Sequence, residues 1–121
     1  GAHLTLFCDA GFGLHVLGHW VREKGVISLE EGVRRLSSDP ADLFGIKDRG
    51  RLQVGLAADV TVFDPQTIGS SNRGEKRYDL PGNAKRMVMP SQGIDCSVVN
   101  GKISYANGKM MDSRSGKVLR S

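Results

Sequence analysis

The spacing of apolar residues changes near Gly45, and this change constrains the fold more than any other feature of the sequence. Before Gly45, apolar side chains recur every three or four residues, which is typical of amphipathic helices. After Gly45, short runs rich in β-branched residues alternate with turn residues, which is typical of strands. A chain of 121 residues fits one domain but is too short for a (β/α)₈ barrel, which needs about 250 residues. We therefore expect an α+β fold in which helices precede strands.

The first helix is expected over residues 12–24. Phe12, Val16 and Trp20 follow the four-residue spacing of a buried helical stripe. Gly25 should end the helix, because glycine readily adopts the left-handed conformation found at helix C-termini.

Two shorter helices are expected next. Ser28 and Glu31 form a capping box, in which the Ser28 hydroxyl accepts from the Glu31 amide while the Glu31 side chain reaches back. The third helix should begin with Asp39 as its N-cap and Pro40 at its first helical position. Gly45 should stop it.

The second part of the chain is expected to be built from short strands and turns. Asn-Gly pairs at 100–101 and 107–108 predict tight type I′ hairpin turns, so the last strands should form a meander. Residues 66–83 are polar and are expected to form a long surface loop, and 112–121 a loosely held tail. Strands are predicted at 51–54, 60–63, 86–89, 97–99, 102–105 and 109–111.

The charge is unevenly distributed, with a net −2 over residues 1–64 and +6 over residues 65–121. A basic half can indicate nucleic-acid binding, but these basic residues are scattered and accompany no nucleic-acid-binding motif. We therefore expect no nucleic acid as a partner. No stretch approaches the roughly 18 apolar residues of a membrane span, so we expect no membrane partner either. Cys8 and Cys96 indicate free thiols in a reducing, cytoplasmic setting.

Few residues carry recognisable chemistry. His15 and His19 share one helix face, a spacing that metalloproteases use with Glu directly after the first His, where Val16 stands here. Of a metal pair and two surface histidines, we favour the second. Gly11-Phe12-Gly13 begins like a dinucleotide-binding loop but lacks the third glycine. Asp59 precedes a predicted strand and is expected to fix the turn by accepting backbone N–H groups.

Three stretches, residues 28–46, 48–52 and 55–65, together resemble the C-terminal signature of the metal-dependent amidohydrolase superfamily. In that family a short Pro-Ala helix precedes a strand that begins with Ala-Asp, as Ala58-Asp59 does here. Further motifs resemble the N-acyl-D-amino-acid deacylases (D-aminoacylases): Gly-Ala-His at 1–3, Cys-Asp-Ala at 8–10, Trp-Val-Arg-Glu at 20–23, Tyr-Asp-Leu-Pro-Gly at 78–82 and Val-Val-Asn-Gly at 98–101.

The resemblance implies that residues 1–45 are the C-terminal end of a metallo-dependent hydrolase barrel. Residues 46–121 would be part of its small composite β-sandwich domain, with a polar tail. The parent enzyme would use zinc to hydrolyse the linear amide C–N bond of an N-acyl-D-amino acid. The catalytic Asp would lie just upstream of Gly1, so we expect no catalytic or metal-ligating residue here, no bound zinc and an inactive fragment. His3 and Asp9 are expected at the rim of the active site.

The apolar helix stripes would lose their cover if the barrel were absent. We therefore expect a homo-oligomer that buries Trp20. The alternative is a non-catalytic α+β binding module whose basic half, residues 65–121, contacts an acidic partner. Binding that falls steeply with salt would favour this alternative.

Overall fold

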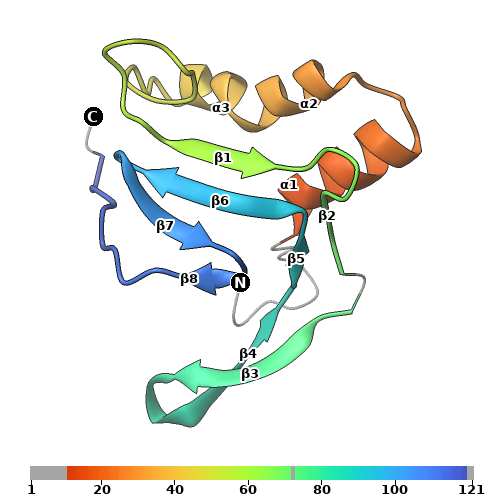
Figure 1. The fold of residues 1–121 in the computed structure, drawn as a ribbon, viewed down its shortest axis with the longest axis vertical. Helices are drawn as coiled ribbons and strands as arrows, with labels where there is room; N and C mark the ends of the chain where they lie inside the picture. The colour runs from red at the N-terminus through yellow and green to blue at the C-terminus, as the bar shows by residue number, and fades with distance from the viewer. Residues whose placement is uncertain (1–10, 72, 120–121) are drawn as a thin grey trace.

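A four-stranded antiparallel sheet lies beside the helices, and a separate two-stranded ribbon projects from one end (Figure 1). The computed structural model describes residues 11–71 and 73–119. The expected α+β order, helices before strands, is confirmed. The helical segments are α1 (Phe12–His15), η1 (Val16–Glu23), α2 (Leu29–Leu36), α3 (Ser38–Leu43) and the short η2 (Pro81–Asn83).

The main sheet has the strand order β1-β6-β7-β8. Its strands are β1 (Val60–Phe63), β6 (Ile94–Val99), β7 (Lys102–Ala106) and β8 (Lys109–Met110). Two further antiparallel ladders are β2 (Gly69–Ser70) with β5 (Ser91–Gln92), and β3 (Glu75–Leu80) with β4 (Ala84–Val88). In Figure 1, α2 and α3 run along the β1 edge of the main sheet, away from β6.

The helix predicted over residues 12–24 is present, but most of it is wider than an α-helix. Only α1 has α-helical geometry, and η1 continues as a π-helix, in which the Lys24 amide donates to the carbonyl of His19 at 2.9 Å. Gly25 follows with a φ of 61°, which confirms the expected glycine stop.

The π-helix packs against the backbone at Ile68, just before β2, and the Ile68 side chain is 1% exposed. A Cβ atom on Gly18 would lie 2.7 Å from the Ile68 carbonyl oxygen, so only glycine allows this approach. Arg22, four residues on, donates a hydrogen bond to the same carbonyl. Gly18 and Arg22 therefore dock the helix on one backbone position.

The N-terminus of α2 follows the prediction in part. The Ser28 hydroxyl accepts from the Glu31 amide at 3.2 Å, as expected. The Glu31 carboxylate, expected to reach back, instead accepts from Arg34 and Arg35 at 2.7–2.9 Å. Two guanidinium groups one turn ahead attract this carboxylate more strongly than a backbone amide does.

The start of α3 differs from the prediction. The N-cap is Ser37 rather than Asp39, and Asp39 lies inside the first turn. Its carboxylate accepts from Arg34 at 2.7 Å, an ion pair that holds it away from a capping position. Gly45 follows the helix with a φ of 67°, as expected for a glycine stop.

The strand predicted at residues 51–54 is wrong, since these residues form an irregular loop. Gly50 and Gly55 flank the segment with φ values of 84° and 90°, so the backbone turns at both ends. Leu52 is 78% exposed and Val54 fully exposed, so the alternating pattern has no sheet to pack against.

The long loop predicted at residues 66–83 is also wrong in its second half, where β3 pairs with β4. Five of the six β3 residues are exposed. Because both faces of the ribbon contact water, its sequence does not alternate between apolar and polar residues. Both predicted Asn-Gly turns are confirmed, with φ values of 47° and 51° at Asn100 and Asn107. The strands predicted around them are confirmed as β6, β7 and β8.

The polar tail is held at two positions rather than lying loose. The Ser113 hydroxyl donates to the carbonyl of Ile103 at 2.8 Å, and the Ser115 carbonyl accepts from the Asn100 side chain at 2.6 Å. These bonds fix the tail beside β7 and the turn that precedes it.

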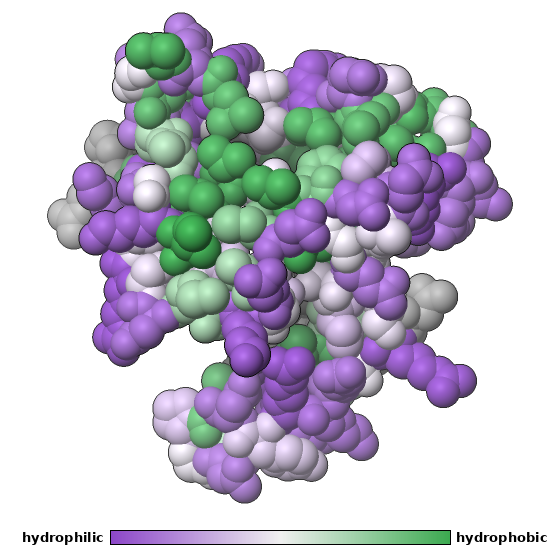
Figure 2. Space-filling model, viewed as in Figure 1, coloured by the Kyte–Doolittle hydropathy of each residue, from purple (hydrophilic) through white to green (hydrophobic). Residues whose placement is uncertain are grey.

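The core is small. Within residues 11–71 and 73–119, the buried apolar side chains are Leu17, Ala41 and Ile68. Phe12, Leu43 and Phe44 are 65%, 81% and 76% exposed, and Figure 2 shows the resulting apolar surface as a green area over the upper part of the molecule. In the same part of the chain, no helix has the length and hydropathy needed to cross a bilayer.

Candidate functional site

The two residues predicted at the active-site rim, His3 and Asp9, lie outside the residues that the structure describes. Their placement stays a prediction. Among the described residues, no three or more His, Cys, Asp or Glu side chains come together as a metal site would require. A cluster of three or more such ligands for a catalytic zinc is therefore not found in residues 11–71 and 73–119.

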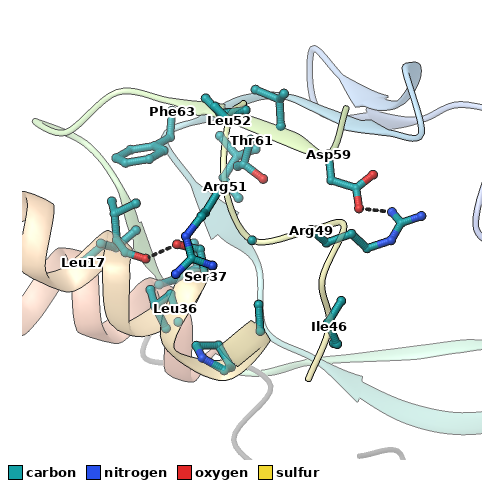
Figure 3. Close-up of a pocket in the computed structure, with 18 of the residues that line it drawn as sticks. Leu17, Leu36, Ser37, Ile46, Arg49, Arg51, Leu52, Asp59, Thr61 and Phe63 are labelled. Atoms are coloured by element: carbon teal, nitrogen blue, oxygen red, sulfur yellow. Dashed lines mark hydrogen bonds and ion pairs between the residues drawn. The ribbon is translucent and has the colours of Figure 1, made fainter. Parts of the chain in front are cut away.

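A polar cluster formed by Arg49, Asp59 and Asn100, here called the clasp, joins three distant segments. Asp59 at the start of β1 accepts from the Asn100 amide at 2.7 Å with one oxygen and from Arg49 with the other. The predicted role of Asp59 as an acceptor for backbone N–H is thus confirmed. Arg49 also donates to the Asn100 side-chain oxygen at 2.6 Å, which closes the triangle. Figure 3 shows Arg49 and Asp59 facing each other.

The clasp is partly shielded from water. The side chains of Arg49 and Asp59 are 15% and 32% exposed. The Asn100 amide, and secondly Arg49, hold the pKa of Asp59 below its usual value, against the opposing effect of burial. Asn100 extends the cluster by donating to the Ser115 carbonyl at 2.6 Å.

The clasp lies beside an apolar groove of about 910 Å³ between the helices and β1 (Figure 3). Arg49, Arg51 and Asp59 contribute to its polar margin. Phe12, Val33 and Phe44 line the groove and are also among the exposed apolar side chains. Apolar side chains that line it include Phe12, Leu17, Val33, Leu36, Phe44 and Phe63.

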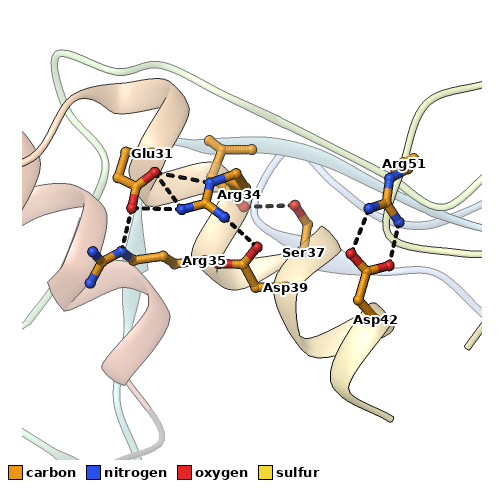
Figure 4. Close-up of polar contacts among 8 residues, drawn as sticks. Glu31, Arg34, Arg35, Ser37, Asp39, Asp42 and Arg51 are labelled. Carbon is orange, nitrogen blue, oxygen red and sulfur yellow. Dashed lines mark hydrogen bonds and ion pairs between the residues drawn. The ribbon is translucent and has the colours of Figure 1, made fainter. Parts of the chain in front are cut away.

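Above the groove, α2 and α3 carry a network of exposed ion pairs (Figure 4). The hydrogen bonds of Arg35 and Arg34 hold the pKa of Glu31 below its usual value. Arg51, from the loop, binds Asp42 through two parallel hydrogen bonds of 2.8 and 2.7 Å, which likewise lower the pKa of Asp42. This network links the loop to α3.

His15, the last residue of α1, and His19, in η1, lie side by side. Their rings stack with centroids 4.7 Å apart and planes inclined by 18°. His19 Nδ1 lies 2.9 Å from the Glu23 carboxylate, a contact that lowers the pKa of Glu23. The Trp20 ring meets both imidazoles edge-on, at 5.1 Å from His19 and 6.2 Å from His15.

Sequence reasoning missed Arg49 and the side-chain role of Asn100. Asn100 was interpreted as a turn residue, and Arg49 is separated from it by 51 positions. The available signal was chemical: a half-buried Asp59 needs a cation or several N–H donors, and two arginines, Arg49 and Arg51, precede it within ten residues.

Comparisons with known proteins agree with one another. N-acyl-D-glutamate deacylase from Alcaligenes xylosoxydans xylosoxydans is 37% identical over 105 residues, which cover 87% of this chain and 19% of that protein. A structure of N-acyl-D-glutamate deacylase from Bordetella bronchiseptica, complexed with zinc and a phosphonate inhibitor, matches with a TM-score of 0.69 and 37% identity. It covers 92% of this chain and 21% of the matched chain.

A crystal structure of D-aminoacylase matches with a TM-score of 0.71 and 30% identity, again over 92% of this chain and 21% of the other. The chain thus spans about a fifth of the length of the relatives it matches. A family model described as "Amidohydrolase family" matches residues 3–105. The shared fold, the level of identity and this match lead to one conclusion: the chain belongs to the amidohydrolase family and resembles the D-aminoacylases.

Proposed function

We propose that this chain is the C-terminal part of a metal-dependent amidohydrolase that cleaves the amide C–N bond of N-acyl-D-amino acids. The observation that carries the proposal is the 37% identity to N-acyl-D-glutamate deacylase over 87% of the chain, joined to the structural match with the enzyme from Bordetella bronchiseptica. In this proposal the helices belong to the end of a barrel and the strands to a small β-sandwich.

The metal is assigned to the rest of the parent enzyme. A structure in the same comparison describes a binuclear metal centre in D-aminoacylase, and another contains zinc. When bound, zinc would supply an activated water for amide hydrolysis. Because residues 11–71 and 73–119 hold no donor set of this kind, the 121-residue chain alone is proposed to be inactive. The contribution of the chain is structural, since the clasp and the groove shape the surface on which other parts of the enzyme would pack.

A chimeric enzyme tests this proposal. The matching 105-residue segment of the Alcaligenes N-acyl-D-glutamate deacylase would be replaced by the corresponding segment of this chain. We expect the zinc-loaded chimera to hydrolyse N-acetyl-D-glutamate, while the 121-residue chain alone gives no turnover above a metal blank. A folded, zinc-loaded chimera without activity would contradict the proposed function. Turnover by the isolated chain would contradict its assignment as an inactive part.

We also propose that the isolated chain forms a homo-oligomer through its exposed apolar surface. Trp20 is 45% exposed and Phe44 76% exposed, which leaves both available for an interface. Light scattering should give a mass above the 13.1 kDa of one chain, and Phe44→Ser should lower it. A monomer at all concentrations contradicts the proposal, and salt-sensitive capture of an acidic protein by this monomer would favour the binding-module alternative.

A further inference from the structure

The histidine pair on the first helix has a geometry that the proposed function does not use. We propose that His15 and His19 form a surface site for a divalent transition-metal ion such as Zn²⁺ or Ni²⁺, with water completing the coordination. Imidazole nitrogen is a preferred ligand of these ions. Both imidazoles of this site come from one helical segment of this chain.

The first argument is the placement of the two rings. His15 and His19 are four residues apart, so their side chains project from the same side of the helix. The rings are nearly parallel, with centroids 4.7 Å apart. Two nitrogen ligands on one tetrahedral ion lie roughly 3.3 Å apart, given Zn–N bonds of about 2.0–2.1 Å. The stacked planes do not meet at one ion, so binding requires the exposed His15 ring to turn about its side-chain bonds until its nitrogen and that of His19 point at the same ion.

The second argument is the role of Glu23. Its carboxylate lies 2.9 Å from His19 Nδ1, and a carboxylate oxygen can only accept a hydrogen bond from that nitrogen. The neutral ring of His19 then carries its proton on Nδ1, which leaves the lone pair on Nε2 for a metal ion. Metal-binding histidines in proteins commonly have such a carboxylate partner, which fixes both tautomer and ring orientation.

The third argument is access. In the single chain, His15 is exposed and the His19 side chain is 31% exposed, so an ion can reach the pair from solvent when the interface proposed at Trp20 is not formed. The site offers two protein ligands rather than three or four, since no larger group of His, Cys, Asp and Glu forms among the described residues. It should therefore bind reversibly and exchange with solution, unlike a structural zinc site with four protein ligands.

Trp20 provides a direct readout of this site. It is the one tryptophan of the chain, and its ring lies 5.1 Å from His19 and 6.2 Å from His15. Ni²⁺ held by both imidazoles would quench its fluorescence, whereas Zn²⁺ would occupy the pair without strong quenching. The experiment titrates the 121-residue chain, in a Cys8→Ser, Cys96→Ser background that removes thiol ligands, with NiCl₂ and follows Trp20 emission.

We expect saturable quenching at one ion per chain, reversed by EDTA and prevented by prior addition of ZnCl₂. His15→Gln and His19→Gln should each weaken Ni²⁺ binding about tenfold or more, and Glu23→Ala by a smaller factor through lost orientation of His19. The titration is repeated with His3→Gln, because Gly-Ala-His at a free N-terminus can itself bind Ni²⁺, and the quenching assigned to His15 and His19 should remain in that variant. Quenching that is linear in Ni²⁺, or that survives His15→Gln and His19→Gln, would overturn the proposal.

A second measurement needs no substitution. Imidazole ¹H–¹⁵N spectra of the same chain with and without ZnCl₂ should shift the signals of two of the three histidines. Shifts in all three rings, or in none, would contradict a site confined to this pair. Because these readouts are binding and not hydrolysis, a failure here leaves the proposed amidohydrolase function untouched, and an inactive chimera leaves this site untouched.

Discussion

Arg49 and Arg51 leave the same loop two residues apart, and each binds an aspartate, but their surroundings differ. Arg51 and Asp42 form the better aligned pair, with two parallel hydrogen bonds, yet their side chains are 46% and 59% exposed. Arg49 and Asp59 are 15% and 32% exposed and share their partner Asn100. Hydrogen-bond alignment alone would rank the Arg51–Asp42 pair first.

Solvent access, and not hydrogen-bond alignment, should decide how much each pair contributes to the free energy of unfolding. In an exposed pair, water screens the attraction between the charges, and fixing two long side chains costs entropy. The net contribution to stability is therefore small. A shielded charge without its partner is costly, because nothing replaces the lost water. The clasp should therefore matter for stability and the Arg51–Asp42 pair should not. The following variants test this contrast in order of expected effect.

Replacement of Asp59 should have the largest effect. Asp59→Ala removes the carboxylate that is hydrogen-bonded to Arg49, whose remaining carboxylate neighbour is Asp48 at 3.8 Å, and it removes the acceptor of the Asn100 amide. We expect the free energy of unfolding to fall by about 2–4 kcal/mol, measured by urea denaturation. A loss as small as that of an exposed variant would show that the clasp contributes no more than a surface pair.

The two Asn-Gly turns offer a matched pair of variants. Asn100→Gly and Asn107→Gly place glycine at φ values of 47° and 51°, so both turns stay unstrained. Only the first removes hydrogen bonds to Arg49 and Ser115. Asn100→Gly should be less stable than Asn107→Gly by about 1–2 kcal/mol in the same urea assay. Equal stabilities would indicate that these side-chain bonds are replaced by water without loss.

Acid should lower the stability of the chain by protonating Asp59 in the clasp. The pKa of Asp59 in the folded chain lies below its ordinary value of 3.8. Stability from this group is therefore fully present above the unfolded pKa and is lost as the pH falls through the folded one. Thermal midpoints measured from pH 7 downward should decline below about pH 4, and less steeply in Asp59→Ala than in the parent chain. Identical slopes for both chains would contradict this assignment.

The smallest effect is expected for the exposed pair. Asp42→Ala removes the bidentate partner of Arg51, but both groups regain water. The urea midpoint should stay within measurement error of the parent, and the acid slope should change less than in Asp59→Ala. A loss comparable to that of Asp59→Ala would break the contrast and show that loop tethering matters more than shielding.

Local sequence signals predicted the parts of this fold that depend on local chemistry. The Ser28 cap, the glycine stop at Gly25 and the turn at Asn100 each follow from a few adjacent residues, and each is confirmed. The strand expected at 51–54 failed because alternation alone cannot supply a neighbouring strand. The strand β3 was missed because it is formed by hydrogen bonding to β4, whereas its sequence has no alternating apolar pattern.

In the candidate site, too, local features were predictable from the sequence and contacts between distant segments were not. The backbone role of Asp59 was predictable from its position before a strand, whereas its contact with Arg49 required the fold to bring the loop and β1 together. His15 and His19 were expected on one helix face, and the structure adds ring stacking and the Glu23 contact. The sequence analysis favours two surface histidines over a metal pair, and the contacts of these rings are the reason that the metal pair is proposed instead.

The projecting β3–β4 ribbon has a consequence for how this chain can change length. Its base is closed where the Ser71 amide donates to the Pro90 carbonyl at 3.0 Å, directly beside the β2–β5 ladder. Everything between these two residues can be shortened to a tight loop, or lengthened, without moving the main sheet or Ile68. Insertions and deletions among related chains should therefore concentrate between residues 72 and 89, which also makes this the safest position for an engineered tag.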